Sequence, residues 1–300
     1  MQTLAINFSS PPQEGKISII IPVKDDVEGL DITLNSLNQT KPTSKSYEII
    51  VANDGGSDAI SARCSTDDAV KEVKLIPNRG PGGARNEALT HSSGAFIAFL
   101  DADVVVTHGW WEALLSHAKT HDYIAGRIDI NPSLISNFFH KYDEATAFDV
   151  KGYMSRHHGA TANLMVSRTL LENIGGFDAR FRSGEDTEFG IRAHEAQQKM
   201  IYADDMVVLH PPRSFSQQRK KIFRVVLGHL QLAETFPDRF GKYTLTARLI
   251  ISLLIPPRKV VKNEALMRKY RLPTKINLYA TRYASRLYIL YCYLWIQLTG

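Results

Sequence analysis

Short apolar runs that end in polar residues recur through the first third of the chain. Apolar runs of this length, rich in β-branched residues, are typical of buried strands. We therefore expect four strands in this part of the chain, each followed by polar residues. They are "ISIIIPV" (17–23), "YEIIVAND" (47–54), "VKLIPN" (73–78) and "GAFIAFLDADVVV" (94–106).

Apolar residues at helical spacing occupy the segments between these runs. Leu30, Leu34 and Leu37 recur at intervals of three or four residues, and "GGARNEALTHS" (82–92) opens another helix. Strands that alternate with helices predict an α/β fold with a mostly parallel central sheet and helices on both faces. In such sheets, ligands bind at the carboxyl ends of the strands.

The same kind of pattern continues to the prolines at 211 and 212. It predicts a helix at 110–120, a strand at 123–130, a strand, helix, turn and helix within 159–196, and a strand at 200–210. We expect a flexible lead-in at residues 1–15, a catalytic domain at 16–212 and a helical, basic C-terminal region at 213–300.

The C-terminal region combines apolar runs with positive charge. Helical spacing predicts a helix at 216–236, and apolar runs follow within 245–262 and 283–298. Each run is about a dozen residues long, whereas a bilayer-spanning helix needs about 20. Such segments either pack on the catalytic domain or lie in the plane of a membrane surface with basic residues beside them. We expect the second arrangement.

The charge of the chain is divided unevenly. Residues 213–300 contain 17 Lys and Arg against three acidic residues, a net charge of +14. Residues 1–212 contain 19 against 28, a net charge of −9. A basic block on an acidic body predicts an anionic partner. Because no nucleic-acid-binding motif appears, we expect an anionic membrane surface and no nucleic acid.

The composition indicates an ordinary globular protein, with 44% hydrophobic and 22% charged residues in a chain of 300. Cys64 and Cys292 show no disulfide or metal spacing, which favours a reducing compartment. The N-terminal residues lack the basic and apolar pattern of a signal peptide. We expect a cytoplasmic protein, peripheral on the cytoplasmic face of a membrane.

Polar residues follow the expected strands at the edge where ligands bind. An aspartate after a strand is also a common turn or helix-capping residue, so each one alone is ambiguous. Together they predict one polar cleft at this edge of the sheet. The residues are Asp25 and Asp26, Asn53 and Asp54, Asn78 and Arg79, and Asp101 and Asp103.

Asp101 and Asp103 predict a metal site in this cleft. In an extended segment they point the same way, with Ala102 on the opposite side. Two converging carboxylates repel each other unless a cation or a shared proton neutralises them. Oxygen ligands favour Mg²⁺ or Mn²⁺, and such a metal keeps positions open for substrate phosphates. The pair therefore predicts a diphosphate ligand.

Six segments occur in an order that resembles a known family. They are "ISIIIPVKDD", "YEIIVANDGGSD", "NRGPGGARNEAL", "GAFIAFLDADVVV", "IGGFDARFRSGEDTEF" and "VVLHPPR". These resemble the motifs of family 2 glycosyltransferases, which have the GT-A fold. The resemblance covers about Lys16 to Arg213, and it implies transfer of a sugar from a nucleotide sugar.

The resemblance implies a nucleoside pocket at the ends of the first strands. Asp54 matches the acid that hydrogen-bonds the base or the ribose. Pro22 and Val23 match the strand-end backbone that lines the pocket. Arg85, in "GARN", matches a basic residue near the base and the diphosphate.

Further matches imply how the diphosphate and its metal are held. Asp101 matches the acid that faces the ribose and metal-bound water, and Asp103 matches the direct metal ligand. His210 resembles a late metal ligand of some members, although it could instead be a capped loop histidine. Arg213 resembles a diphosphate contact.

The carboxylates of "GEDTE" are the expected catalytic residues. The resemblance implies that Asp186 deprotonates the acceptor hydroxyl and that Glu185 orients the acceptor. The pair also opens a helix-like segment, where acidic residues are common for electrostatic reasons. Because adjacent helical residues do not share a face, at most one of the two is the base, and we expect Asp186.

The sequence departs from the family pattern at two places. The usual tyrosine and asparagine after the first strand are replaced by Lys24 and Asp25. The usual Asp-Asp-Gly-Ser reads Asn53-Asp54-Gly55-Gly56, which retains the acid at 54. The first departure weakens any assignment of nucleobase contacts to residues 24 and 25.

The function expected from these observations is metal-dependent hexosyl transfer. The donor is expected to be a UDP-sugar, the metal Mn²⁺ or Mg²⁺, and the acceptor a hydroxyl of a saccharide or lipid-linked molecule in glycan, polysaccharide or glycolipid synthesis. One base opposite the leaving group predicts inversion at the anomeric carbon.

Two alternatives belong to other classes of protein. The first is a sugar-phosphate nucleotidyltransferase of related fold, which usually carries a glycine-rich basic loop after its first strand. This chain has the acidic "PVKDDVEGL" there. The second is a non-enzymatic basic membrane adaptor, which the C-terminal charge fits.

Overall fold

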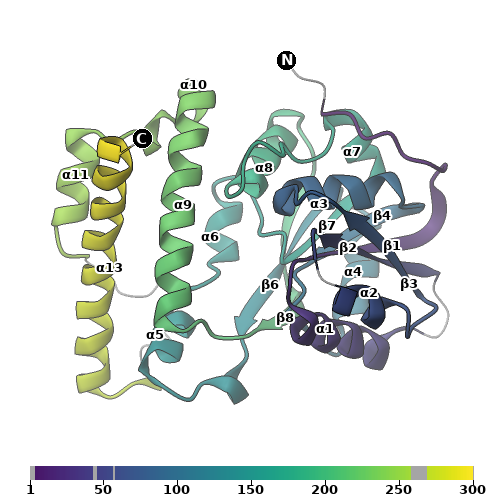
Figure 1. Cartoon of the computed structure of the whole chain (residues 1–300), viewed down its shortest axis with the longest axis horizontal. Helices are drawn as coiled ribbons and strands as arrows, with labels where there is room; N and C mark the ends of the chain where they lie inside the picture. The colour runs from purple at the N-terminus through teal and green to yellow at the C-terminus, as the bar shows by residue number, and fades with distance from the viewer. Residues whose placement is uncertain (1–3, 43–45, 57, 258–268, 300) are drawn as a thin grey trace. The chain divides into compact units, whose positions relative to one another are not determined.

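The computed structural model of the chain describes residues 4–42, 46–56, 58–257 and 269–299 (Figure 1). The chain divides into two compact units. The first unit is formed by Met1–Asp129 and Val150–Pro211, and the second by Ile130–Asp149 and Pro212–Gly300.

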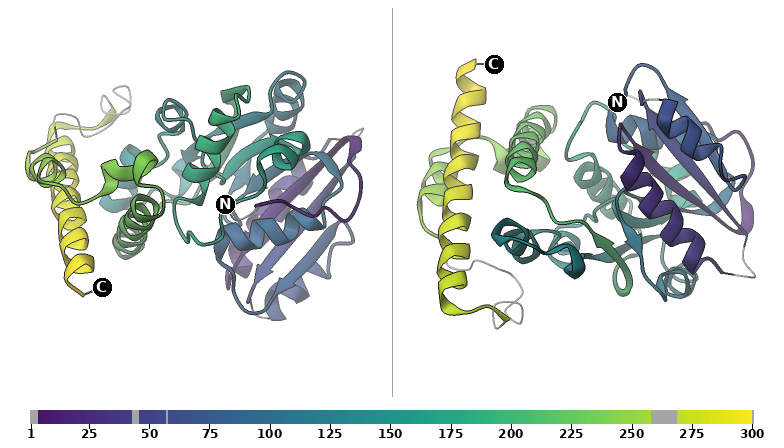
Figure 2. Two further views of the ribbon diagram at one scale, coloured as in Figure 1. Left: turned by 90° about the horizontal axis from the view of Figure 1, so that it is seen from above. Right: turned by 60° about the horizontal axis from the view of Figure 1, so that its bottom comes forward.

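The first unit contains one eight-stranded mixed sheet in the order β3-β2-β1-β4-β7-β6-β8-β5 (Figures 1 and 2). Strands β3, β2, β1 and β4 are parallel, whereas β7 is antiparallel to β4 and β6, and β5 is antiparallel to β8. The strands are β1 (Gln13–Val23), β2 (Tyr47–Asp54), β3 (Val70–Leu75), β4 (Gly94–Leu100), β5 (Val105–Val106), β6 (Tyr123–Ile130), β7 (Asn163–Ser167) and β8 (Met200–His210).

Helices cover both faces of this sheet. Helices α1 and α2 lie on one face, and α3 and α7 lie on the other (Figure 1). This confirms the predicted α/β fold with parallel central strands and helices on both faces. The helices of the first unit are α1 (Val27–Thr40), α2 (Asp58–Cys64), α3 (Gly80–Thr90), α4 (Trp110–His117), α6 (Val150–Met154), α7 (Arg168–Ile174) and α8 (Glu185–Glu195).

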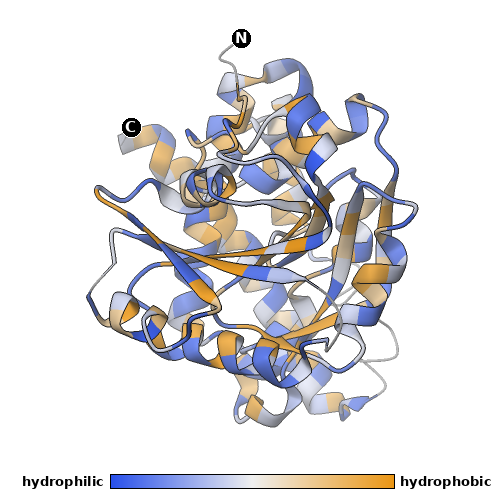
Figure 3. Cartoon of the chain, turned by 90° about the vertical axis from the view of Figure 1, so that its right-hand side faces the viewer, coloured by the Kyte–Doolittle hydropathy of each residue, from blue (hydrophilic) through white to orange (hydrophobic). Residues whose placement is uncertain are grey.

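The core of the first unit forms where the apolar pattern predicts it. Leu30, Leu34 and Leu37 of α1 are buried, and so is the β1 run Ile19, Ile20 and Ile21. Hydrophobic colouring follows the sheet strands, while the helices alternate between hydrophobic and hydrophilic positions (Figure 3). Burial of the strands from both faces explains why their sequences read as nearly continuous apolar runs.

The chain before β1 is held against the first unit by backbone hydrogen bonds. The N–H of Ser9 donates to the carbonyl of Thr90 at 2.8 Å, and the N–H of Gly176 donates to the carbonyl of Leu4 at 2.8 Å. Residues 4–12 form no helix or strand, and residues 1–3 of the expected lead-in lie outside the described part of the chain.

The expected strand at 94–106 is two strands separated by a loop. Strand β4 ends at Leu100, and β5 pairs with β8 on the far side of the sheet. The expectation that Asp101 and Asp103 lie in an extended segment is therefore wrong. The cause is a tertiary contact: Thr33 Oγ1 of α1 donates to the carbonyl of Val104 at 2.8 Å and accepts from its N–H at 3.0 Å.

The second unit is built from helices. Ser214 begins α9 with a reciprocal capping box that involves Gln217, and the core contains Val226, Leu253 and Tyr293. The elements are η1 (Pro132–Leu134), α5 (Phe138–Thr146), α9 (Phe215–Thr235), α10 (Pro237–Phe240), η2 (Gly241–Tyr243), α11 (Ala247–Leu254) and α13 (Leu272–Thr299).

The two apolar runs of the C-terminal region lie in different helices, and the structure describes only the second run in full. The first contains α11, and its residues from 258 to 262 lie outside the described part of the chain. The second lies within the long helix α13. Among the described residues, none of the helices is both long and apolar enough to cross a bilayer.

Candidate active site

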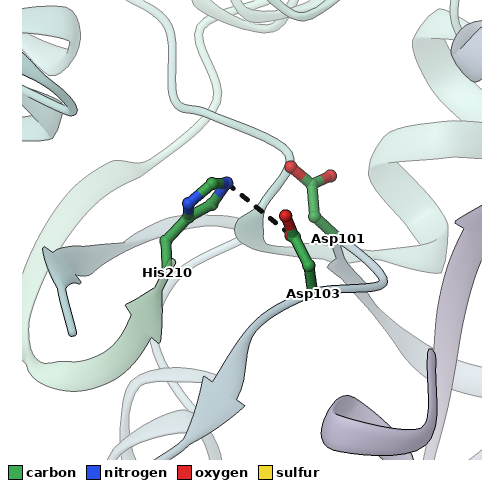
Figure 4. Close-up of side chains that lie close together, drawn as sticks. All are labelled: Asp101, Asp103 and His210. Atoms are coloured by element: carbon green, nitrogen blue, oxygen red, sulfur yellow. Dashed lines mark ion pairs between the residues drawn. The ribbon is translucent and has the colours of Figure 1, made fainter. Parts of the chain in front are cut away.

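Asp101, Asp103 and His210 form a group that could hold a metal ion (Figure 4). The two aspartates lie in the loop after β4, and His210 ends β8. One ligand atom from each residue lies within 4.8 Å of the others, and His210 Nε2 is 3.6 Å from Asp103 Oδ1. These residues would hold a divalent cation, which would supply positive charge to a bound diphosphate.

The orientation of the His210 imidazole is suited to metal binding. Its Nδ1 lies 2.7 Å from the carbonyl oxygen of Pro211, which can only accept a hydrogen bond. Nδ1 therefore carries the proton in the neutral ring, and the lone pair of Nε2 is on the side of Asp103. A second partner that fixes the tautomer in this way is typical of ligating histidines.

Arg85 of α3 joins this group to the start of α8. One guanidinium nitrogen donates to Asp101 Oδ1 at 3.2 Å, and the other donates to Glu185 Oε1 at 3.1 Å. The Arg85 side chain is only 4% exposed and that of Glu185 only 8%. A buried guanidinium that bridges two carboxylates fixes both of them and offsets part of their negative charge.

The first turn of α3 contains three glycines and lies close to α8. Gly80 has a positive φ of 76° at the first residue of the helix. A Cβ on Gly82 would lie 3.4 Å from Glu185 Cγ and 3.4 Å from Phe177 Cβ, at ordinary van der Waals distance. The first turn of α3 thus lies against the first turn of α8.

Asp186 follows Glu185 in the first turn of α8. Burial raises the pKa of its carboxyl above the ordinary value of 3.8, and the negative charge of Asp101 raises it further. The Arg85 charge and a 2.7 Å hydrogen bond from the backbone N–H of Thr187 oppose that rise. A raised pKa brings an acid closer to the range in which it can accept a proton from an acceptor hydroxyl near neutral pH.

Asp54 is held at the end of β2. Its Oδ2 accepts from Asn78 Nδ2 at 2.6 Å, and its Oδ1 accepts from the backbone N–H of Arg79 at 2.7 Å. On the neighbouring strand β1, Pro22 and Val23 end in register with the last residues of β2. These three expected donor-binding residues therefore share one edge of the sheet.

Arg213 belongs to the second unit. Its backbone N–H donates to Asp143 Oδ2 at 2.8 Å, and its guanidinium lies 3.7 Å from the same oxygen. The guanidinium also stacks over the Phe148 ring at 4.9 Å from the centroid. Within the first unit, the structure brings together Asp101, Asp103, His210, Arg85 and Glu185.

Two supporting residues belong to none of the motifs recognised in the sequence. Thr33 and Ser36 of α1 hold the loop after β4, since Ser36 Oγ accepts from the N–H of Val106 at 3.0 Å. Both hydroxyls are buried beside the leucine stripe of the helix. Polar residues on the apolar face of a helix were the available signal.

Residues 18–186 of the chain match the sequence model of a known protein family. A sequence model described as "Glycosyl transferase family 2" matches residues 18–186, more than half of the chain. The chain belongs to this family. The match spans Asp54, Arg85, Asp101, Asp103 and Asp186, and it confirms the resemblance read from the motifs.

Two glycosyltransferases of similar sequence support this family membership. Glycosyltransferase AglE from Haloferax volcanii is 32% identical over 226 residues, which cover 72% of this chain and 73% of AglE. A GalNAc(5)-diNAcBac-PP-undecaprenol beta-1,3-glucosyltransferase from Campylobacter jejuni is 26% identical over 236 residues, 73% of each chain.

A solved structure supports the fold. The mannosyltransferase PcManGT from Pyrobaculum calidifontis, in complex with GDP-Man and Mn²⁺, superposes with a TM-score of 0.60. It is 18% identical in sequence, and the match covers 97% of this chain and 89% of that one. The chain is thus a glycosyltransferase with a GT-A-like fold that takes its sugar from a nucleotide sugar.

Proposed function

We propose that the chain is a metal-dependent, inverting hexosyltransferase that uses a nucleoside diphosphate sugar, expected to be a UDP-sugar. Its acceptor is the hydroxyl of a saccharide or lipid-linked molecule in glycan, polysaccharide or glycolipid synthesis. The observation that carries this proposal is the grouping of Asp101, Asp103 and His210, with Arg85 linking Asp101 to the first turn of α8.

Asp101, Asp103 and His210 are the proposed metal ligands. A nitrogen ligand beside two carboxylates favours Mn²⁺ over Mg²⁺, because imidazole suits transition-metal ions. When bound, the cation would supply positive charge to the diphosphate leaving group. The Mn²⁺ and GDP-Man in PcManGT support this proposal, although they leave the nucleotide of this chain to be tested.

Asp54, Pro22 and Val23 are the proposed nucleoside contacts at the neighbouring strand ends. The two protein hydrogen bonds to Asp54 fix its orientation while each carboxylate oxygen retains a further lone pair. Arg213 is kept as a proposed diphosphate contact. The proposed catalytic domain is residues 16–212, with a basic accessory region at 213–300.

Asp186 is the proposed general base, and Glu185 positions the site. The carboxylate of Glu185 is buried and paired with Arg85, so abstraction of a proton by Glu185 would disrupt a buried ion pair. The pKa of Asp186 is raised by burial, as suits a group that must accept a proton. A single base on the side away from the leaving group leads to inversion.

Two observations support a lipid-linked acceptor and peripheral attachment at the cytoplasmic face of a membrane. The name of the Campylobacter relative specifies an undecaprenol-diphosphate-linked saccharide. In this chain, α13 carries Leu287, Tyr291, Leu294 and Leu298 on one stripe, and all four are exposed. Together with the +14 charge of residues 213–300, this stripe suits an anionic membrane surface.

A donor-turnover assay tests the proposed function. The purified chain is incubated with UDP-glucose, UDP-N-acetylglucosamine or GDP-mannose, with Mn²⁺ or with EDTA, and release of the nucleoside diphosphate is measured. We expect Mn²⁺-dependent release with a UDP-sugar. Release of pyrophosphate from a sugar phosphate and a nucleoside triphosphate would instead indicate a nucleotidyltransferase, which family membership argues against.

A further inference from the structure

The second unit contains a cavity of about 370 Å³ that the glycosyltransfer chemistry does not use. Its walls come from α5, α9, η2, α11 and α13, all within that unit. Pockets that hold small molecules usually have volumes of about 300–1,000 Å³. The cavity is therefore large enough for a ligand.

Most of the cavity wall is apolar or aromatic. Such a lining favours hydrocarbon, because burial of apolar surface releases about 25 cal/mol per Å² and the wall offers few partners to water. The apolar and aromatic lining residues are Tyr142, Ala147, Ile222, Val225, Val226, Tyr243, Leu249, Ile289 and Tyr293.

The polar part of the wall is dominated by hydrogen-bond donors. Lys221 and Arg282 contribute positive charges, and Gln218 contributes an amide. The Gln218 Nε2 atom is buried and has no hydrogen-bond partner among the described residues. Asp143 is the single acidic residue of the lining, and its carboxylate already accepts from the backbone of Arg213.

This combination defines the kind of ligand that the cavity would bind. The apolar wall favours a hydrocarbon, whereas two cations and the Gln218 amide in the wall favour an acceptor that carries negative charge. We infer that the cavity binds the hydrocarbon end of an anionic lipid, with a phosphate head group held by Lys221 and Arg282. The inference concerns the second unit alone and does not rest on the proposed function.

Calorimetry on the full chain tests this site with a soluble probe. Decyl phosphate is titrated below its micellar concentration, beside decanol and inorganic phosphate. We expect saturable 1:1 binding of decyl phosphate and at least about tenfold weaker binding of the other two, because a charged hydrogen bond contributes about a factor of ten or more. Equal binding of decanol, or of inorganic phosphate, would overturn the inference.

Substitutions locate the binding to the cavity. The Lys221→Ala/Arg282→Ala variant should weaken decyl phosphate at least about tenfold and leave decanol unchanged. The matched control is Lys220→Ala/Arg224→Ala, which changes two exposed cations of the same helix that do not line the cavity. Equal affinities for both double variants would contradict the assignment.

A filled cavity provides an independent test. Ile289→Trp places a larger side chain in the wall, whereas Ala284→Trp adds a larger side chain at an exposed position of the same helix. We expect loss of decyl phosphate binding in the first variant and retention in the second. If Ile289→Trp does not fold, the alanine variants still decide the result, and unchanged affinity in a folded Ile289→Trp protein would overturn the inference.

Discussion

Asp186 combines two properties at the scale of a single residue. Desolvation of its partly buried carboxyl, together with the negative charge of Asp101, raises its pKa, yet Arg85 and the Thr187 N–H keep its ionised form accessible. A carboxyl whose pKa is higher in the folded than in the unfolded protein destabilises the fold above both pKa values. That cost disappears as the pH falls below the unfolded value. The proposed base therefore lowers the free energy of unfolding at neutral pH.

Asp186→Asn should separate catalysis from stability. We expect kcat to fall about 10²- to 10⁴-fold with donor affinity retained, because the amide cannot accept the acceptor proton. The melting temperature should rise at pH 7 to 8, and this gain should vanish toward acid pH. The exposed Glu195→Gln in the same helix is the control, and an unchanged kcat for Asp186→Asn would refute the role of the base.

The same residue sets the expected pH dependence of the wild-type enzyme. A base must be deprotonated to act, so kcat should fall as the pH drops through the pKa of Asp186. Because that pKa is raised, the acid limb of the profile should lie above 3.8. A rate profile measured at saturating donor and metal checks this, and a flat profile across the acid range would argue against Asp186 as the base.

Arg85 is the second residue with a disproportionate effect on its surroundings. Arg85→Met leaves Glu185 buried without its cation, and we expect the free energy of unfolding to fall by about 3–5 kcal/mol. The double variant Arg85→Met/Glu185→Gln should recover part of this loss, since the uncompensated charge is removed. Urea denaturation of the four proteins in the cycle measures the coupling. Strictly additive losses would show that the ion pair is not coupled.

At the scale of elements, the position of the metal-binding loop depends on α1. Thr33 Oγ1 satisfies both the N–H and the carbonyl of Val104, and Ser36 Oγ satisfies the N–H of Val106. These bonds end the extended run after Leu100 and turn Asp101 and Asp103 toward His210. Helix α1 thus positions the loop that carries Asp101 and Asp103, although the helix itself supplies no metal ligand.

Thr33→Val removes the hydroxyl and keeps the shape of the side chain. It leaves two buried backbone groups of Val104 without partners, and we expect a loss of about 1–3 kcal/mol in the free energy of unfolding. Mn²⁺ affinity should fall with it because the loop is less fixed. Thr33→Ser retains the hydroxyl and is the control; calorimetric titration of Mn²⁺ that shows equal affinities for both variants would contradict this role.

The elements show how far the sequence could be interpreted. Strands β1 to β4 and helix α1 follow directly from short apolar runs and from the leucine spacing, because those patterns depend on local burial alone. The end of β4 at Leu100 could not be predicted in this way, since it is set by Thr33, which lies 68 residues earlier than Asp101. The polar cleft expected at the strand ends stays a prediction.

For the same reason, only part of the candidate site could be predicted from the sequence. Asp101 and Asp103 are separated by one residue in the sequence, and their chemistry alone predicted a metal. The hydrogen bond from Arg85 to Glu185 joins residues 100 positions apart, and the spacing of hydrophobic residues cannot predict such a pairing. The resemblance implied a place for Arg85 near the nucleotide, which stays a prediction, and it did not indicate that the guanidinium pairs with Asp101 and Glu185.

For the molecule as a whole, the net charge differs strongly between the two parts of the chain. Residues 1–212 carry −9 and residues 213–300 carry +14. The exposed stripe on α13 adds apolar surface to the basic region, including Tyr291 and Leu294. Contiguous apolar surface with basic residues nearby is the combination that binds anionic membranes.

Vesicle sedimentation tests this property on the full chain. We expect binding to vesicles that contain anionic phospholipid, little binding to zwitterionic vesicles, and loss of binding as salt rises and screens the charges. Tyr291→Asp/Leu294→Asp should weaken binding without unfolding the protein, because both side chains are exposed. Binding that is insensitive to salt and to this variant would contradict peripheral attachment through α13.

Calorimetric titration of a UDP-sugar measures metal-dependent donor binding, the property on which the proposed function depends. The wild-type chain and Asp103→Asn are each titrated in Mn²⁺ and in EDTA, with GDP-mannose as the second donor. We expect tight binding only for the wild type in Mn²⁺, because Asp103 and His210 lie 3.6 Å apart at the proposed metal position. Equal affinities in Mn²⁺ and EDTA, or in both proteins, would contradict a metal-held diphosphate.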